Sequence, residues 1–581
     1  MTQFTFHSNM QQQQLVLDFE GFRGAMATEY YNLGSYTRPI TTASKQAQLW
    51  FDRGLVWGYG FNHEESVKCF EAAIAADPSC AMAYWGVAYS LGPNYNKPWE
   101  FFDEQDLEST VDRAHKATSQ AAERAANATP VEQAIIHALQ SRYPKRQHER
   151  AGPRDECSVW NRDYAAAMAH VYRSFPDDLD VATLYADALM NLTPWQLWDI
   201  RTGKPAEGAR TLEIKDVLER AIGQNPHHPG LLHLYIHLME MSAHPELALN
   251  AADNLRGLVP DAGHLNHMPT HLDILVGDYR SAISSNSQAI VADEKFLQRE
   301  GPMNFYSLYR SHDYHFRIYG AMFAGKFQVA LDTVAQLEAS LPEELLRVES
   351  PPMADWLEGF LPMRAHVLVR FGRWDDIVAL ELPKDPALWC VTTAMTYYAK
   401  GVALAATGRV AEAAAARESF LAAVKTVPAS RTLFNNTCLD ILAVAEAMLD
   451  GELEYRRGNI ELAFEHLRKA VKLDDSLPYD EPWGWIQPTR HAYGALLLEQ
   501  GRVEEAAAVY SADLGLDDTL PRALQHRNNV WSLHGYHECL RKLGRDAEAR
   551  ILEQQLQLAT AVADVPIKAS CFCRLRHGED R

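Results

Sequence analysis

The chain has 581 residues, 47% of them hydrophobic and 23% charged, so it can bury a large core and has the composition of a globular protein. Its formal net charge of -21 argues against nucleic acid and anionic membranes as partners, because both require a basic face. We also expect no membrane helix, since no apolar run reaches roughly 18 residues, and the absence of a signal-peptide pattern favours a cytoplasmic protein.

Residues 1–38 carry a glutamine run and few periodic apolar positions, which predicts a partly disordered N-terminal arm. From residue 39 to about 560 one helical pattern follows another, with long insertions near residues 93–160 and 191–210. Residues 561–581 are predicted to be a C-terminal tail. Alternating runs typical of strands are lacking, so an all-α protein is expected.

The first helix pair has the spacing of a tetratricopeptide repeat (TPR), a helix-turn-helix unit of roughly 34 residues. Small residues of this unit let the helices approach, and large ones fill the gap between them. The residues at signature positions are Trp50, Gly54, Trp57, Ser66, Phe70, Ala73 and Pro78. Later helix pairs are predicted to turn at Gly277, Gly325, Gly372, Gly408, Gly458, Gly501 and Gly544. The fold class is therefore a TPR-like α-solenoid, a superhelix of antiparallel helix pairs that can close around a central pocket.

Two histidine stripes stand out near the middle of the chain. His233, His237 and Glu240 lie at i, i+4 and i+7. The second stripe consists of His264, His267 and His271, at i, i+3 and i+7. Each spacing places its three side chains on one face of a helix. In the TPR frame these positions face the concave groove.

Imidazoles one helical turn apart can share a metal ion, and an adjacent repeat can supply further ligands. The sequence thus predicts a site for a divalent transition metal, with ligands His233, His237, Glu240, His267 and His271. Iron or copper is favoured, and zinc or manganese also fits nitrogen and carboxylate ligands. No cysteine belongs to this set, which disfavours a structural thiolate zinc site.

Four more groove residues are predicted to act in catalysis, as hydrogen-bond partners of the ligands or as general acids and bases. They are Asp187, His264, His312 and His315. The competing interpretation is structural, because a single helical histidine is most often a satisfied or solvated residue. The recurrence of histidines at groove positions favours a shared site.

Two functions follow from this pattern. The first is a metal-dependent enzyme that transforms a small-molecule substrate in the concave pocket, with oxidative chemistry slightly favoured over hydrolysis. The alternative is a non-catalytic TPR adaptor that binds a protein partner in its groove, where the histidines serve as pH-sensitive contacts. Stoichiometric bound metal would distinguish the enzyme from the adaptor.

Several segments resemble a widespread group of bacterial and fungal TPR proteins. They include YADALMNLTPW (185–195), GLLHLYIHLMEM (230–241) and GHLNHMPTH (263–271). The last of these, GHLxHMPxH, is the most specific, and the resemblance covers the chain from about residue 31 to about residue 556. The resemblance implies that a histidine-rich groove is a feature of the group. It brings no reaction with it.

Overall fold

The computed structural model describes residues 30–147 and 153–575. Helices dominate the described chain and follow one another as a solenoid. The N-terminal helices are α2 (Lys45–Tyr59), α3 (His63–Ala76), α4 (Ala81–Leu91), η1 (Trp99–Phe101), α5 (Glu104–Arg124), η2 (Ala125–Asn127), α6 (Pro130–Gln140), α7 (Pro153–Ser174), α8 (Leu179–Met190) and α9 (Thr211–Gln224).

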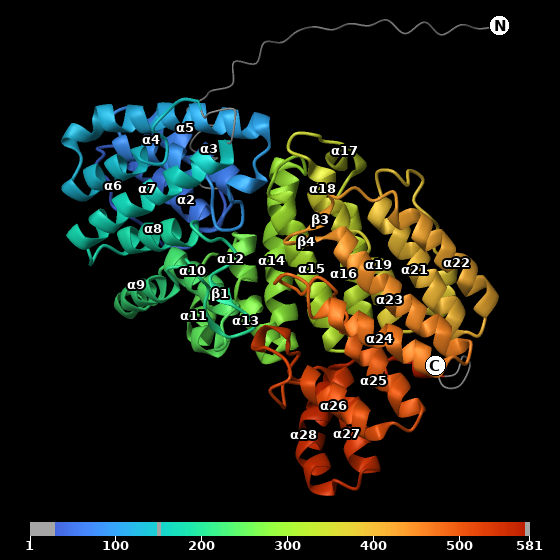
Figure 1. The fold of residues 1–581 in the computed structure, drawn as a ribbon. Coiled ribbons are helices and arrows are strands. Elements are labelled where there is room, and N and C mark those ends of the chain that lie inside the picture. Colours follow the sequence, from blue (N-terminus) through green and yellow to red (C-terminus); the bar gives the residue numbers. More distant parts are fainter. Residues whose placement is uncertain (1–29, 148–152, 576–581) are drawn as a thin grey trace, which may run out of the picture.

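The middle of the chain crosses the centre of the molecule (Figure 1). Its helices are α10 (Pro229–Glu240), η3 (Pro245–Ala248), α11 (Leu249–Leu255), α12 (Gly263–His267), α13 (Pro269–Val276), α14 (Tyr279–Glu300), α15 (Ser307–Phe323), α16 (Phe327–Ser340), α17 (Glu343–Leu346), α18 (Met353–Leu357), η4 (Glu358–Phe360), α19 (Met363–Arg370) and α20 (Trp374–Ala379).

The C-terminal part continues the helical pattern. It comprises α21 (Cys390–Ala406), α22 (Val410–Val424), α23 (Cys438–Arg456), α24 (Ile460–Asp474), α25 (Thr489–Glu499), α26 (Val503–Asp513), η5 (Arg522–Leu524), α27 (Val530–Lys542), α28 (Asp546–Val562) and η6 (Phe572–Arg574). The strands among the described residues form two short antiparallel hairpins, which the sequence did not predict. They are β1 (Trp198–Asp199) with β2 (Lys204–Pro205), and β3 (Thr432–Leu433) with β4 (Asn436–Thr437).

The expected packing of a TPR unit is present in the first three helices. Phe70 of α3 inserts between Gly54 of α2 and Gly86 of α4, where an added Cβ would lie 2.9 Å and 2.4 Å from its ring. Only glycine lets the helices approach this closely around a phenyl ring. All seven predicted turn glycines have positive φ, as the left-handed end of a helix requires. The all-α, TPR-like solenoid predicted from the sequence is confirmed.

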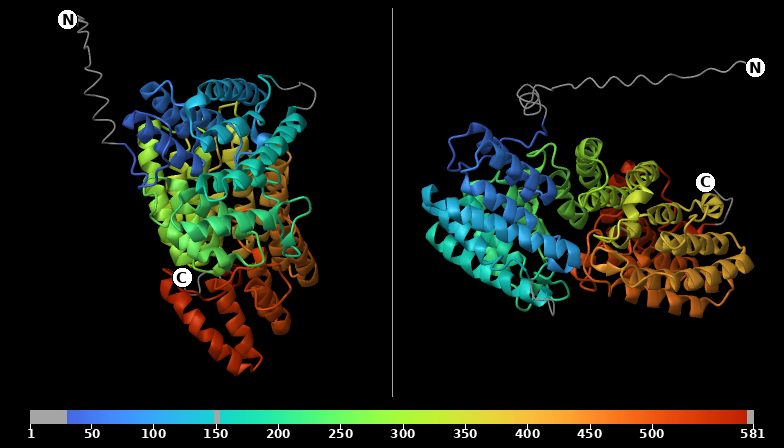
Figure 2. Two further views of the ribbon diagram at one scale, coloured as in Figure 1. Left: turned by 90° about the vertical axis from the view of Figure 1, so that its left-hand side faces the viewer. Right: turned by 90° about the horizontal axis from the view of Figure 1, so that it is seen from above.

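The superhelix curves so that its two halves contact each other (Figure 2). Ser350 donates a hydrogen bond of 2.8 Å to Asp103 of the N-terminal half. Nearby, the rings of Phe101 and Trp356 lie 6.0 Å apart. The concave face is therefore enclosed between the halves. None of the helices in the described part of the chain combines the length and apolarity needed to cross a bilayer.

The structure describes parts of the predicted N-terminal arm, of the two insertions and of the C-terminal tail. Residues 1–29 of the predicted arm lie outside the described residues, whereas Arg38 forms a buried ion pair of 2.6 Å with Asp180. The predicted insertions contain α5 and α6 in one case and the β1–β2 hairpin in the other. In the predicted tail, Ser570 donates to the His491 carbonyl at 3.0 Å, and a disulfide joins Cys571 to Cys573.

Candidate metal centre

Six imidazoles converge in the buried centre of the superhelix, and we call them the histidine cluster. They come from α10, from the consecutive helices α12 and α13, and from α15. The members are His233, His237, His264, His267, His271 and His312. None of them exposes more than 5% of its surface. A metal or ligand in this cluster would be shielded from bulk water.

The helices that carry the cluster are surrounded by other parts of the protein, which explains why the histidines are shielded from water. Every residue of α10 is buried, so this helix has no polar, solvent-facing stripe. Gly230 in its first turn lets α10 approach its neighbours, because an added Cβ would lie 2.8 Å from Thr183 and 2.9 Å from Tyr59. The predicted stripe of α10 thus faces protein.

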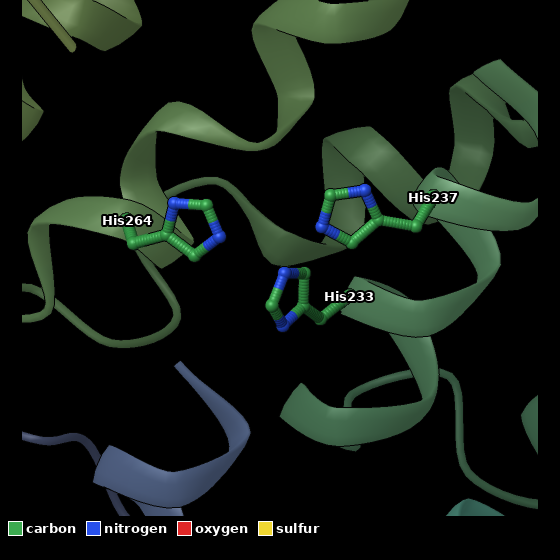
Figure 3. Close-up of side chains that lie close together, drawn as sticks. All are labelled: His233, His237 and His264. Carbon is green, nitrogen blue, oxygen red and sulfur yellow. The ribbon is translucent and has the colours of Figure 1, made fainter. Parts of the chain in front are cut away.

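The first trio consists of His233, His237 and His264. Its three rings point toward one another across the gap between α10 and α12 (Figure 3). The ring centroids of His233 lie 4.8 Å from His237 and 4.9 Å from His264. One nitrogen from each ring falls within a common set in which all atoms are within 4.8 Å of one another. Three imidazole nitrogens at this spacing fit a single metal ion.

The second trio consists of His267, His271 and His312. His267 and His271 have their Nε2 atoms 2.7 Å apart, and the ring of His312 lies 4.5 Å from that of His267. The Nδ1 atom of His267 lies 2.7 Å from the side-chain oxygen of Asn286, which fixes the orientation of its ring. The trio again offers three nitrogens within 4.8 Å of one another.

Carboxylates lie between and beside the two trios. Glu240 contacts Nδ1 of His237 at 2.9 Å with one oxygen and Nδ1 of His271 at 2.7 Å with the other. Glu481 lies against the same nitrogen of His271. Asp313, next to His312, approaches Nδ1 of His267 at 3.4 Å. Oxygen ligands are thus available in addition to nitrogen ligands.

Several donor atoms of the cluster have no hydrogen-bond partner, although they are buried. The group includes Nε2 of His233, Nε2 of His237, both ring nitrogens of His264, Nδ1 of His312 and both oxygens of Asp313. Unpaired polar atoms are costly in a protein interior. A metal cation would satisfy such lone pairs, so the residues fit a metal ion.

In the first trio, the protonation states of the imidazoles also favour ligation. Burial lowers the pKa of His233 to about 3 and moves the pKa values of His237 and His264 well below the ordinary range. These imidazoles are therefore neutral at pH 7 and keep a lone pair free, as a metal ligand requires. Burial would also lower the pKa of His271, but Glu481 and Glu240 raise it to about 10. The carboxylates thus favour a positive charge at this point.

Three aromatic residues with a left-handed backbone pack on the cluster. Phe61, Trp195 and Phe434 have φ values of 57°, 59° and 49°. Their rings lie 4.4 Å from His233, 5.9 Å from His237 and 4.8 Å from His312, respectively. A bulky residue in this conformation costs roughly 1–2 kcal/mol, and such strain concentrates at functional sites. The strained aromatic residues wall the cluster with apolar surface.

A cavity of about 300 Å³ approaches the cluster from the N-terminal half. Its lining includes Phe61 and Tyr309, whose rings lie 5.7 Å and 4.9 Å from that of His264. Part of its wall comes from the predicted insertion at 93–160, through Asn94 and Lys97. A small molecule in this cavity would lie close to the first trio.

The structure separates the predicted site residues into two groups. All five predicted ligands lie in the cluster or beside it, and so do His264 and His312, two of the predicted catalytic residues. Asp187 instead accepts hydrogen bonds from Tyr89 and Asn191, at 3.3 Å and 3.0 Å.

His315, the fourth predicted catalytic residue, packs its ring 5.3 Å from that of Phe360. Neither Asp187 nor His315 belongs to a ligand group of the described residues. Helix register alone predicted a groove position for these two side chains, and among the described residues they have these neighbours rather than a place in a ligand group.

Sequence reasoning missed Glu481 and Asp313. Glu481 lies in a loop between α24 and α25, where no periodic pattern marks a side chain that faces the groove. Asp313 could have been suspected, because it directly follows His312 on a helix that carries two groove histidines. Phe61 gave a weaker signal, as it precedes the N-cap residue Asn62 of α3.

Comparisons with known proteins provide no family for this chain. No protein-family model matches it, and no curated protein matches it in sequence. Similar solved structures include yeast Tom70, with 12% identity over 89% of this chain and 93% of that one, at a TM-score of 0.30. Others are the APC/C hetero-tetramer Cut9–Hcn1 (13% identity, 90% and 82% coverage, TM-score 0.31) and Naa15/Naa10 bound to HypK-THB (14%, 88% and 70%, TM-score 0.21).

Proposed function

We propose that this protein is a metal-dependent enzyme that holds a transition metal ion in the histidine cluster and transforms a small molecule. The observation that carries the proposal is the convergence of six buried imidazoles and two glutamates, several of whose nitrogen and oxygen atoms have no hydrogen-bond partner. A purely structural role would require these polar groups to be paired with one another or with the backbone.

The donor set limits the metals that suit the site. Imidazole nitrogens with carboxylate oxygens suit iron, copper, zinc or manganese, and none of the described cysteines belongs to a ligand group. When bound with an open position, such a metal polarises an oxygen of the substrate, activates water or takes part in redox chemistry. We favour oxidative chemistry because nitrogen-rich sets suit iron and copper.

The protein's own residues have clear tasks in this proposal. Glu240 orients His237 and His271 through their Nδ1 atoms, and Asn286 orients His267. Phe61, Trp195 and Phe434 exclude water from the cluster, which strengthens electrostatic interactions there. The cavity of about 300 Å³, whose lining residues Phe61 and Tyr309 contact His264, has room for a small molecule, and its polar lining includes His63, Asn94 and charged side chains such as Lys97.

The test is elemental analysis of the purified protein combined with its visible absorption spectrum. His312 and His315 offer a matched pair, because both are buried in α15 but only His312 belongs to the cluster. We expect the His312→Ala variant to bind less metal than the wild type and the His315→Ala variant to bind as much as the wild type. A folded wild-type protein that binds no transition metal after exposure to iron, copper, zinc or manganese would contradict the proposal and favour the adaptor.

A further inference from the structure

We infer that the cluster holds two metal ions at the same time, one in the first trio and one in the second. This inference rests on the proposed function only in requiring that the cluster binds metal. It adds a second metal site and a stoichiometry, neither of which follows from metal binding as such.

The two trios share no residue. His233, His237 and His264 form one set, and His267, His271 and His312 form the other. Each set supplies three nitrogens within 4.8 Å of one another, which suffices for one metal ion. One ion in the first trio would leave the second trio without a cation, buried and next to three carboxylates.

Two further ligand groups combine histidines of both trios with carboxylates, and they also correspond to two metal sites. His237, Glu240, His271 and Glu481 form one such group. His264, His267 and Asp313 form the other, and these two groups also share no residue. Each of these two groups shares one histidine with the first trio and one with the second. Among the four ligand groups of the described residues, at most two can therefore be chosen that have no residue in common. Two ions are therefore the number that this geometry accommodates.

Two carboxylates lie at the junction of the two trios. Glu240 contacts His237 of the first trio and His271 of the second, and Glu481 contacts His271 as well. Two carboxylates on one imidazole, away from water, favour the binding of positive charge at this point.

A second metal cation would supply positive charge beside Glu240 and Glu481. Glu240 contacts Nδ1 of one imidazole in each trio, so it would orient one ligand of each of two neighbouring ions. Together with Glu481 and Asp313, it places three carboxyl groups beside the two trios. Paired metal ions are commonly roughly 3.5–4 Å apart and act on one oxygen-bearing ligand held between them. The ligand class of this centre is therefore an oxygen donor small enough to contact both ions.

The experiment measures metal ions per chain by native mass spectrometry and elemental analysis. The full-length protein is freed of metal, loaded with Cu²⁺ or Zn²⁺ and desalted. We expect two ions per wild-type chain and one ion in each of the His233→Ala and His312→Ala variants, because each variant damages a different trio. Adjacent Cu²⁺ ions should also couple magnetically, so the paramagnetic resonance signal per copper should be weaker in wild type than in either variant.

The outcomes separate the inference from the proposed function. One ion per wild-type chain overturns the inference and leaves the proposed function standing, whereas no ion in wild type overturns both. Two ions retained in both variants overturn the assignment of the ions to the trios. The His315→Ala variant, whose changed residue lies outside the cluster, controls for general effects on folding and should retain two ions. Circular dichroism checks that each variant is folded.

Discussion

The carboxylate of Glu481 lies against the imidazole of His271, which joins a loop of the C-terminal half to helix α13 at the centre of the molecule. This contact completes the candidate metal centre with a residue from a distant repeat. It also explains why the concave face is enclosed, since the loop that carries Glu481 packs against the histidine cluster.

The first prediction concerns this contact. Replacing Glu481 by glutamine removes a negative charge and should weaken metal affinity by roughly tenfold or more, a typical effect of losing a ligand or its close partner. Competition with a coloured chelator would measure it. The Glu358→Gln variant is a control, because Glu358 is also a buried carboxylate but bonds to the start of α21. Equal affinity in both variants would exclude Glu481 from the centre.

A second prediction addresses the strained backbone at Phe61. The Phe61→Ala variant loses the ring that packs on His233 but keeps a side chain at a φ of 57°, whereas Phe61→Gly relieves the left-handed strain. We expect the glycine variant to be more stable than the alanine variant by about 1 kcal/mol, the reverse of the usual order. Urea unfolding of the two variants measures the difference. A more stable alanine variant would show that this backbone is unstrained.

A third prediction uses two helical glycines with different surroundings. Gly230→Ala should destabilise the protein by roughly 1–3 kcal/mol and reduce metal content, because the added methyl group would overlap Thr183 and Tyr59 and displace α10. Gly223 in α9 has nothing within 4 Å of an added Cβ, so Gly223→Ala should be neutral or stabilising by up to about 1 kcal/mol. Thermal unfolding compares the variants. Similar effects at both positions would contradict close packing at α10.

The fourth prediction is a pH dependence from a histidine outside the cluster. Burial lowers the pKa of His366 from 6.5 to about 3, and its Nδ1 atom lies 3.3 Å from the Gln487 amide nitrogen. The unfolded chain therefore takes up a proton at higher pH than the folded one. Stability from this group is full above pH 6.5 and declines by about 1.4 kcal/mol per pH unit as the pH falls toward 3.

The measurement for His366 compares urea unfolding of wild type and the His366→Asn variant at pH 7.5, 6 and 5. Asparagine can keep the contact with Gln487 but does not titrate. We expect the wild type to lose stability on acidification faster than the variant. Parallel pH profiles would indicate that His366 is not buried in its neutral form. Taking the difference between the two proteins removes the contribution of all other titrating groups.

The sequence by itself determined the helices, their TPR-like pairing and the two histidine stripes. These features are local, because helix periodicity fixes which side chains share a face and glycine fixes where a helix turns. The spacing of His233, His237 and Glu240, and of His264, His267 and His271, therefore sufficed to predict side chains that the structure brings together.

Only the tertiary structure decided which other side chains reach that point. Glu481 arrives through a loop, and Asp313 lies beside the predicted His312, whereas Asp187 and His315 have other neighbours. The physical reason is that the curvature of the superhelix and the path of its loops depend on packing between distant repeats, which no local periodicity encodes.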